Sequence, residues 1–537
     1  MGLRGAILIA AVLVTFSNCS PELDFVSVGA KSDSTGSNSD TESPSNSSSY
    51  VLANTVQRLG VTWTFGRPVR VGKYINGDYW VMSDDLSDPT IPVIGISPAS
   101  VTVGGRTVNG SEINRDVRSP NQGFDSNISS YNESLNVGLG VSPSTPLILN
   151  PASQQDNILS LLSSRSEING HPLHLARVAI LTVLLPTPSN LVPAADAFRP
   201  YWGRGNSGFP ISKVKAAHSQ GSNLNRFLFT VPGLPPIYDG DQNIFYQNVL
   251  GQFPPQLVLR EQWGNSSYGQ SLDLPFTLNV NAAVAPDRSA GYGRETSTQV
   301  ARALLVLMSS AAPSIKQELF IDLVQEGLDL LSAGRGVRGA NGGHVQGRKI
   351  LATMASVFFE SDPVLGAWAR SSIANDAFSE DWQFKWRPRA GFEFGEFGFR
   401  KNDDYLDPFN NPTGNNNANI FRLGSTLEQH LWWATAPFSE FGTQTTWGSY
   451  VACCTINAGA GIFAAYLKAI GGRNAWQTSV HQGRYFDFVH NFIAHGLTQP
   501  SGYSPVWIFF DSRLLQHYLH LVNVYGPVNQ QVATDPI

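Results

Sequence analysis

The chain has 537 residues, and only 14% of them are charged, against about a quarter in typical soluble domains. Polar uncharged residues must therefore cover much of the surface, which is common among exported bacterial proteins. A formal net charge of -5 argues against a general nucleic-acid-binding protein, so no nucleic-acid partner is expected.

The first 18 residues are predicted to be a lipoprotein signal peptide. Arg4 supplies the positive charge, and residues 6–16 form an apolar core that is too short to span a bilayer. The Phe-Ser-Asn-Cys sequence that follows resembles a bacterial lipobox, in which Cys19 would be lipidated; simple secretion is the alternative. Residues 19–50 are a Ser- and Asn-rich linker that should stay solvated. We expect a cell-envelope protein, an outer-membrane lipoprotein or a secreted one, that meets a membrane only through this N-terminal anchor.

Residues 51–290 are predicted to form a β-rich, sandwich-like domain. Many short β-branched or aromatic runs separated by Gly, Pro, Asn and Asp are typical of that architecture. They begin at Val61, Tyr79, Val93, Val101, Leu135, Ala179 and Phe276. Asn76-Gly77-Asp78 has the composition of a tight turn between strands. Residues 194–241 are irregular, and we expect a long loop that reaches the partner domain.

Residues 291–537 are predicted to form a mainly helical domain that carries the active site. Apolar residues recur with helical spacing near residues 300–307, 320–331, 350–357, 463–470 and 485–492. Pro313 is expected to open the second of these helices, because proline is favoured at the first helical position. Helices joined by polar loops suggest helical hairpins packed around an axis.

A glycine-rich segment, residues 334–349, lies between two of these helices. Its cations include Arg338, Arg348 and Lys349, and it also holds Asn341 and His344. Arginine binds carboxylate or sulfate groups through paired hydrogen bonds, and histidine transfers protons near neutral pH. The segment therefore predicts a site for an anionic ligand. The alternative is a solvated turn whose cations offset helix-end dipoles.

A second group of functional side chains lies in residues 378–387. Glu380 and Asp381 stand beside Trp382 and Trp386, a combination that suits a sugar subsite. Indole faces stack on sugar rings, while carboxyl groups bond hydroxyls or act on the glycosidic oxygen. A helix N-terminus capped by Ser379 explains the same residues equally well.

A third group lies in residues 445–455, where Trp447 and Tyr450 precede two adjacent cysteines. A tyrosine can exchange protons once its neighbours lower its pKa, although buried tyrosines usually only pack. Cys453 and Cys454 are interpreted as two buried thiols or as a strained vicinal disulfide.

Two histidine pairs, His171 with His174 and His517 with His520, lack the Glu of a His-Glu-x-x-His zinc motif. They are interpreted as ordinary histidines, so no metal is expected. Walker-type and Gly-x-Ser-x-Gly motifs do not occur, and no cofactor is expected.

The layout resembles secreted bacterial carbohydrate-active enzymes with an (α/α) toroid domain, of the polysaccharide lyase or glycoside hydrolase type. The resemblance covers the architecture and the Asn341 to Lys349 segment. In such lyases an Asn or Arg neutralises a uronate carboxylate while a His or Tyr removes a proton. The resemblance therefore implies these roles for Asn341, Arg348, His344 and Tyr450.

The leading hypothesis is a membrane-tethered polysaccharide lyase that cleaves uronate-containing glycans by β-elimination. In this hypothesis His344, Tyr450 and Arg348 are catalytic, and substrate binds Arg338, Asn341, Lys349, Trp382, Trp386 and Trp447. One alternative is a glycoside hydrolase that uses Glu380 or Asp381 with a further carboxylate, Glu393 or Asp376. The other is a non-catalytic glycan-binding surface lipoprotein.

Overall fold

The fold is that of a computed structural model, which describes residues 50–103, 106–116, 121, 123, 131–154, 156–166, 175–203, 224–237, 293–333, 348–374, 387–389, 392–394, 458–470 and 512–526. Every described residue belongs to one compact unit, Ser47–Ile537. Within the described ranges, no helix is both long and apolar enough to cross a membrane.

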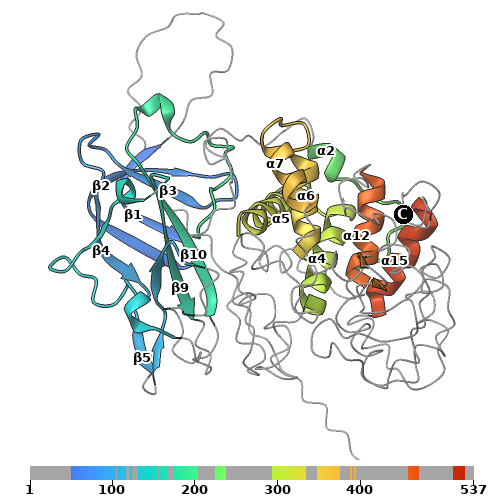
Figure 1. The fold of residues 1–537 in the computed structure, drawn as a ribbon, viewed down its shortest axis with the longest axis horizontal. Coiled ribbons are helices and arrows are strands. Elements are labelled where there is room, and N and C mark those ends of the chain that lie inside the picture. The colour runs from blue at the N-terminus through green and yellow to red at the C-terminus, as the bar shows by residue number, and fades with distance from the viewer. Residues whose placement is uncertain are drawn as a thin grey trace, which may run out of the picture. The chain divides into compact units, whose positions relative to one another are not determined.

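Eight strands form one mixed sheet in the order β7-β9-β10-β3-β2-β4-β8, with β1 paired to β2 beside this path (Figure 1). Neighbouring strands are antiparallel except β3 and β10, which are parallel. The strands are β1 (Val51–Arg58), β2 (Val61–Lys73), β3 (Tyr79–Ser83), β4 (Ile91–Ser97), β7 (Ser111–Ile113), β8 (Leu147–Leu149), β9 (Ile158–Ser166) and β10 (Leu175–Leu184). Two small hairpins lie outside it, β5 (Val101–Val103) with β6 (Arg106–Val108), and β11 (Arg387–Arg389) with β12 (Phe392–Phe394).

The long strand β2 curls this sheet into a half-barrel. Its first half pairs with β4 and its last part with β3, and the register against β4 shifts between Thr64 and Phe65. The β1–β2 ladder shifts again between Ala53 and Thr55. Such bulges bend a strand and increase its twist. The described strands therefore form one curled main sheet, and the predicted β-sandwich is wrong.

Strand β10 shows why a second sheet is not needed to bury this one. Its successive side chains point to opposite faces of the sheet. Ala179 and Leu181 belong to the core formed by the sheet's own strands, whereas Val178 and Ile180 belong to a core shared with the helices. A strand buried on both faces is apolar throughout, so its sequence does not reveal whether a sheet or helices cover it.

The run beginning at Leu135 was predicted as a strand, and this prediction is wrong. Residues Glu133–Leu135 form a short 3-10 helix capped by Asn132. The Asn136 side-chain oxygen then accepts bonds from the backbone N–H of Ser111 (3.0 Å) and Gly138 (3.1 Å). Asparagine side chains offer the backbone such local partners and so favour turns over ladders. By contrast, Asn76-Gly77-Asp78 forms the predicted turn, with Gly77 at a φ of +82.

Seven helices occur among the described residues. They are α2 (Leu224–Phe227), α4 (Gly293–Met308), α5 (Pro313–Ala333), α6 (Arg348–Phe358), α7 (Leu365–Ala374), α12 (Ala458–Ala469) and α15 (Ser512–Tyr525). The helices expected from residues 300–307, 320–331, 350–357 and 463–470 are confirmed, as is the start of α5 at Pro313. Residues 485–492 lie outside the described ranges.

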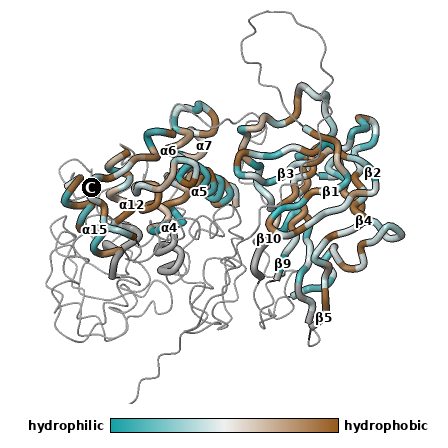
Figure 2. The backbone as a smooth tube through the Cα atoms, turned by 180° about the vertical axis from the view of Figure 1, so that it is seen from behind, coloured by the Kyte–Doolittle hydropathy of each residue, from teal (hydrophilic) through white to brown (hydrophobic). Residues whose placement is uncertain are grey.

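No helical toroid is evident among the described helices, and that part of the predicted fold is wrong. α6 contacts α5 and α7, but α12 contacts α4 and α15, which are distant from it in sequence. α5 is buried at every position from Leu319 to Ala333, although hydrophilic residues recur along it (Figure 2). The helical spacing of apolar residues predicts one buried stripe along α5. It does not reveal that the polar residues of α5 are buried as well.

α5 and α6 approach closely at Gly327, and this gives a testable expectation. A Cβ atom there would lie 2.2 Å from the carbonyl oxygen of Leu351 and 2.9 Å from the Ala355 Cβ. Alanine normally stabilises a helix interior by about 1 kcal/mol relative to glycine. We expect Gly327→Ala to lower the free energy of unfolding instead, by about 1–3 kcal/mol, because the α6 backbone must move.

Urea denaturation of the two proteins measures this effect. The matched control is Gly95→Ala in β4, where the nearest atom to a new Cβ would be the Thr64 Cβ at 3.5 Å, an ordinary contact. A higher urea midpoint for Gly327→Ala than for the unsubstituted chain would contradict the close approach.

Candidate functional site

Most of the residues predicted to form the site lie outside the described ranges. They are Cys19, Arg338, Asn341, His344, Glu380, Asp381, Trp382, Trp386, Trp447 and Tyr450, and Asp376, Cys453, Cys454, His171 and His174 lie outside as well. Glu393 lies in the hairpin strand β12. Arg348 and Lys349 are described, and they occupy the first two positions of α6.

Arg348 and Lys349 are buried, with 3% and 0% of their surface exposed. The solvated-turn interpretation is therefore wrong for these two residues. They also stand at the N-terminal end of α6, which already carries a partial positive charge, so they add to the helix dipole rather than offset it. Burying a cation is costly unless it is paired or hydrogen-bonded. The structure thus concentrates positive charge where the glycine-rich segment ends.

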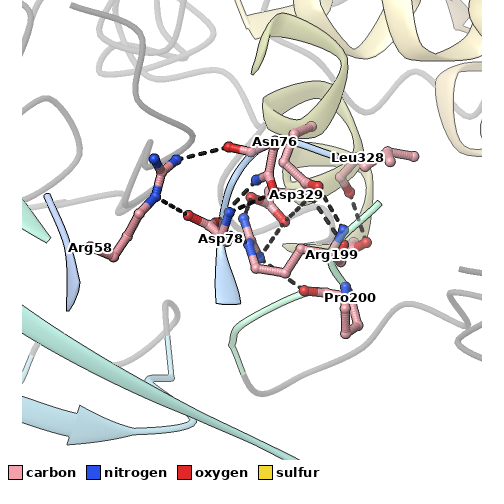
Figure 3. Close-up of polar contacts among 9 residues, drawn as sticks. Arg58, Asn76, Asp78, Arg199, Pro200, Leu328 and Asp329 are labelled. Carbon is pink, nitrogen blue, oxygen red and sulfur yellow. Dashed lines mark hydrogen bonds and ion pairs between the residues drawn. The ribbon is translucent and has the colours of Figure 1, made fainter. Parts of the chain in front are cut away.

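The other end of that segment adjoins a buried ionic cluster on α5. The carboxylate of Asp329, one turn before the end of α5, accepts hydrogen bonds from Nη1 (3.2 Å) and Nη2 of Arg199. The Nε of Arg199 donates a hydrogen bond to Asp78 at 2.8 Å (Figure 3). Arg199 Nη1 also donates to the carbonyl oxygen of Pro200 at 2.9 Å. Both Arg199 and Asp78 are fully buried, so this guanidinium joins the β2–β3 turn to α5 in the protein interior.

Gln325 holds the backbone of Arg199 in place. Its side-chain oxygen accepts the Arg199 N–H at 2.9 Å, and its side-chain nitrogen donates to the Arg199 carbonyl at 3.1 Å. The neighbouring Phe198 packs edge-on against Phe358 and Phe359, with ring centroids 5.9 and 5.4 Å away. The predicted contact between segment 194–241 and the helical half is therefore confirmed at Phe198 and Arg199.

Arg58, at the end of β1, completes the cluster from the sheet side (Figure 3). Its Nε donates to Asp78 at 3.0 Å and its Nη2 to the carbonyl oxygen of Asn76 at 2.8 Å. Asn76 also donates to Asp78 through its side-chain nitrogen at 3.0 Å. The carboxylate of Asp78 thus accepts bonds from two guanidinium groups and one amide.

Burial dominates the electrostatics of the cluster. It raises the pKa of Asp329 to about 6, although the charge of Arg199 and its hydrogen bonds act in the opposite direction. Burial alone would lower the pKa of Arg199, but the charges of Asp329 and Asp78 outweigh it and leave that pKa raised. The guanidinium therefore stays charged, and Asp329 is the bonded carboxyl group whose pKa burial raises.

Nothing in the sequence reveals this cluster locally, since Arg58, Asp78, Arg199 and Asp329 come from four distant segments. One signal was available in α5, where Asp322, Glu326 and Asp329 follow helical spacing and share one face. Such a stripe normally faces solvent, and its burial could not be read from spacing.

The histidines of α15 bond to backbone. The Nε2 atoms of His517 and His520 lie 3.1 and 3.0 Å from the carbonyl oxygens of Pro235 and Pro232. Across the described part of the chain, no three His, Cys, Asp or Glu side chains are grouped so that they could hold a metal ion.

Comparison with known proteins gives no relative for this chain: no family, no curated protein and no solved structure matches it.

Proposed function

We propose that the chain is an exported, membrane-tethered enzyme that degrades a uronate-containing polysaccharide by β-elimination. The observation that supports this proposal is the burial of Arg348 and Lys349 in the first turn of α6. Charges in a poorly solvated interior interact with an anion far more strongly than charges in water. A uronate carboxylate is the anion that a lyase must neutralise, and the proposal rests on these residues rather than on a fold resemblance.

The chemistry follows from that neutralisation. Pairing the carboxylate with Arg348, and with Asn341 and Arg338 of the glycine-rich segment, withdraws negative charge and makes the neighbouring C5 proton more acidic. His344 or Tyr450 then accepts this proton. The bond between C4 and the glycosidic oxygen breaks, a C4–C5 double bond forms, and the departing oxygen takes up a proton.

Aromatic side chains would position the polymer for this step. Trp382, Trp386 and Trp447 offer indole faces on which the apolar faces of sugar rings stack. Lys349, buried at the start of α6, adds a further positive charge near the site, which favours acidic over neutral polysaccharides.

A product assay tests the proposal. The purified mature protein is incubated with acidic polysaccharides (polygalacturonate, alginate, hyaluronan) and with neutral ones (starch, xylan). We expect an increase in ultraviolet absorbance from the new conjugated double bond with an acidic polymer only. Arg348→Met should raise KM or lower kcat by at least about tenfold, since a charge-assisted hydrogen bond contributes about 1.5–3 kcal/mol.

The other outcomes identify the alternatives. New reducing ends without absorbance would reject the lyase in favour of a hydrolase acting through Glu380 or Asp381. Retention on immobilised glycan without any cleavage would indicate a surface binding protein.

A further inference from the structure

The buried carboxyl groups at the acidic face of α5 outnumber the guanidinium groups around them. Asp78 and Asp329 share Arg199, and Asp78 also takes the Nε donor of Arg58. Asp322 lies two turns before Asp329 on the same face of the helix. Glu326, which is 2% exposed, shares this face, so four buried carboxyl groups lie near two guanidinium groups.

Asp322 is one of the carboxyl groups in excess. It is 5% exposed, and no hydrogen bond or ion pair joins it to any residue that the structure describes. Arg58 acts on it by charge alone, because the Arg58 donors are directed to Asp78 and Asn76. An ionised carboxylate without hydrogen bonds is strongly disfavoured in such a place, whereas a protonated one is tolerated.

We propose that Asp322 is a proton-operated latch: when protonated it lets α5 lie against Arg58 and the β2–β3 turn, and when ionised it loosens this contact. The groups that face it come from every element at this contact. Arg58 comes from β1 and Asp78 from the turn, while Glu318 and Glu326 come from α5 itself. α6 packs at Gly327, on a different face of α5.

The direction of the pH effect follows from these neighbours. Burial raises the pKa of Asp322 well above 3.8, Arg58 lowers it, and the three surrounding carboxyl groups raise it further. A carboxyl group with a raised pKa binds its proton more tightly in the closed state than in the open state. The closed state is therefore fully favoured below pH 3.8 and loses this stabilisation as the pH rises towards the raised pKa.

Opening of the latch would release the chain segment around Arg199, which is bonded to Gln325 and Asp329 of α5. The Arg199 N–H bonds to Gln325, one turn after Asp322, and no other bond of that N–H is made within the described residues. Arg58, whose side chain is 22% exposed, marks the side from which water can reach Asp322. The Arg199 amide is thus a local reporter of the contact.

Amide hydrogen exchange of the full chain between pH 4 and 8 tests this proposal. After correction for intrinsic exchange, we expect opening at the Arg199 amide to increase by up to about tenfold per pH unit while Asp322 titrates. Asp322→Asn mimics the protonated, uncharged form of this side chain. It should therefore abolish this increase and raise the Tm at pH 8 by roughly 2–4 °C. At pH 4 the two proteins should melt alike.

The control is Asp156→Asn, which removes an exposed carboxyl group just before β9 and should leave both profiles unchanged. The latch is rejected if exchange at Arg199 in the unsubstituted chain does not depend on pH after correction. It is also rejected if Asp322→Asn keeps the same pH dependence, or melts below the unsubstituted chain at pH 8. The first criterion needs no variant, so it holds even if a substitution impairs folding.

Discussion

Replacing Arg199 by methionine is expected to lower the free energy of unfolding by about 3–5 kcal/mol. Methionine keeps most of the side-chain volume, so the loss reports on charge rather than on a cavity. Asp78 and Asp329 would remain buried, Asp78 with Arg58 and Asn76 and Asp329 with only Gln325 as bonded side-chain partners among the described residues. Buried charge left without its counter-ion is far more costly than the intact pair is favourable.

Chemical denaturation of the full chain measures this loss, with Arg67→Met as the matched control. Arg67 also pairs with an aspartate, Asp88, at 2.6 Å, but both side chains are more than a third exposed. We expect no resolvable change there, since exposed pairs contribute little. Adding Asp329→Leu to Arg199→Met should recover part of the lost stability. Equal effects of Arg199→Met and Arg67→Met would show that the cluster is not a stabilising unit.

Replacing His344 by alanine is expected to reduce turnover of an acidic polysaccharide by about 10²–10⁴-fold, the usual contribution of a general base. The effect should appear in kcat, because the imidazole removes a proton and does not hold the substrate carboxylate. Formation of unsaturated product under substrate saturation measures it.

The control for this variant is His520→Ala, which removes a histidine bonded to the backbone of Pro232. It should leave turnover unchanged. Tyr450→Phe tests the second proton acceptor separately, since phenylalanine keeps the ring and removes only the hydroxyl group. Full activity of His344→Ala together with loss of activity in Tyr450→Phe would transfer the role of base to the tyrosine.

Local structure was largely accessible from the sequence. Helical spacing located α5 and α6, and Pro313 and the turn around Gly77 fixed two boundaries, because these signals depend only on neighbouring residues. The strand predicted at Leu135 does not form, because the Asn136 side chain accepts a hydrogen bond from the backbone N–H of Ser111. The strand propensity of a residue does not account for hydrogen bonds between side chains and the backbone.

The tertiary arrangement could not be predicted from the sequence, because the contacts that define it join residues far apart in the chain. Alternation along β10 shows that both of its faces are apolar without showing that helices cover one of them. The polar stripe of α5 looks like a solvent-facing surface until Arg199, more than a hundred residues earlier, is placed against it. The sequence places two cations at Arg348 and Lys349, but their burial depends on contacts that no local pattern contains.

The two-sided burial of β10 has a consequence for how the chain folds as it is synthesised. Val178 and Ile180 belong to a core that also includes residues of α4 and α5, and these helices are synthesised long after β10. Until then the apolar side chains on one face of β10 remain exposed to water. Transiently exposed hydrophobic surface of this kind promotes aggregation during folding. A chaperone that binds unfolded chains would therefore protect the polypeptide most during the interval between the synthesis of these two segments.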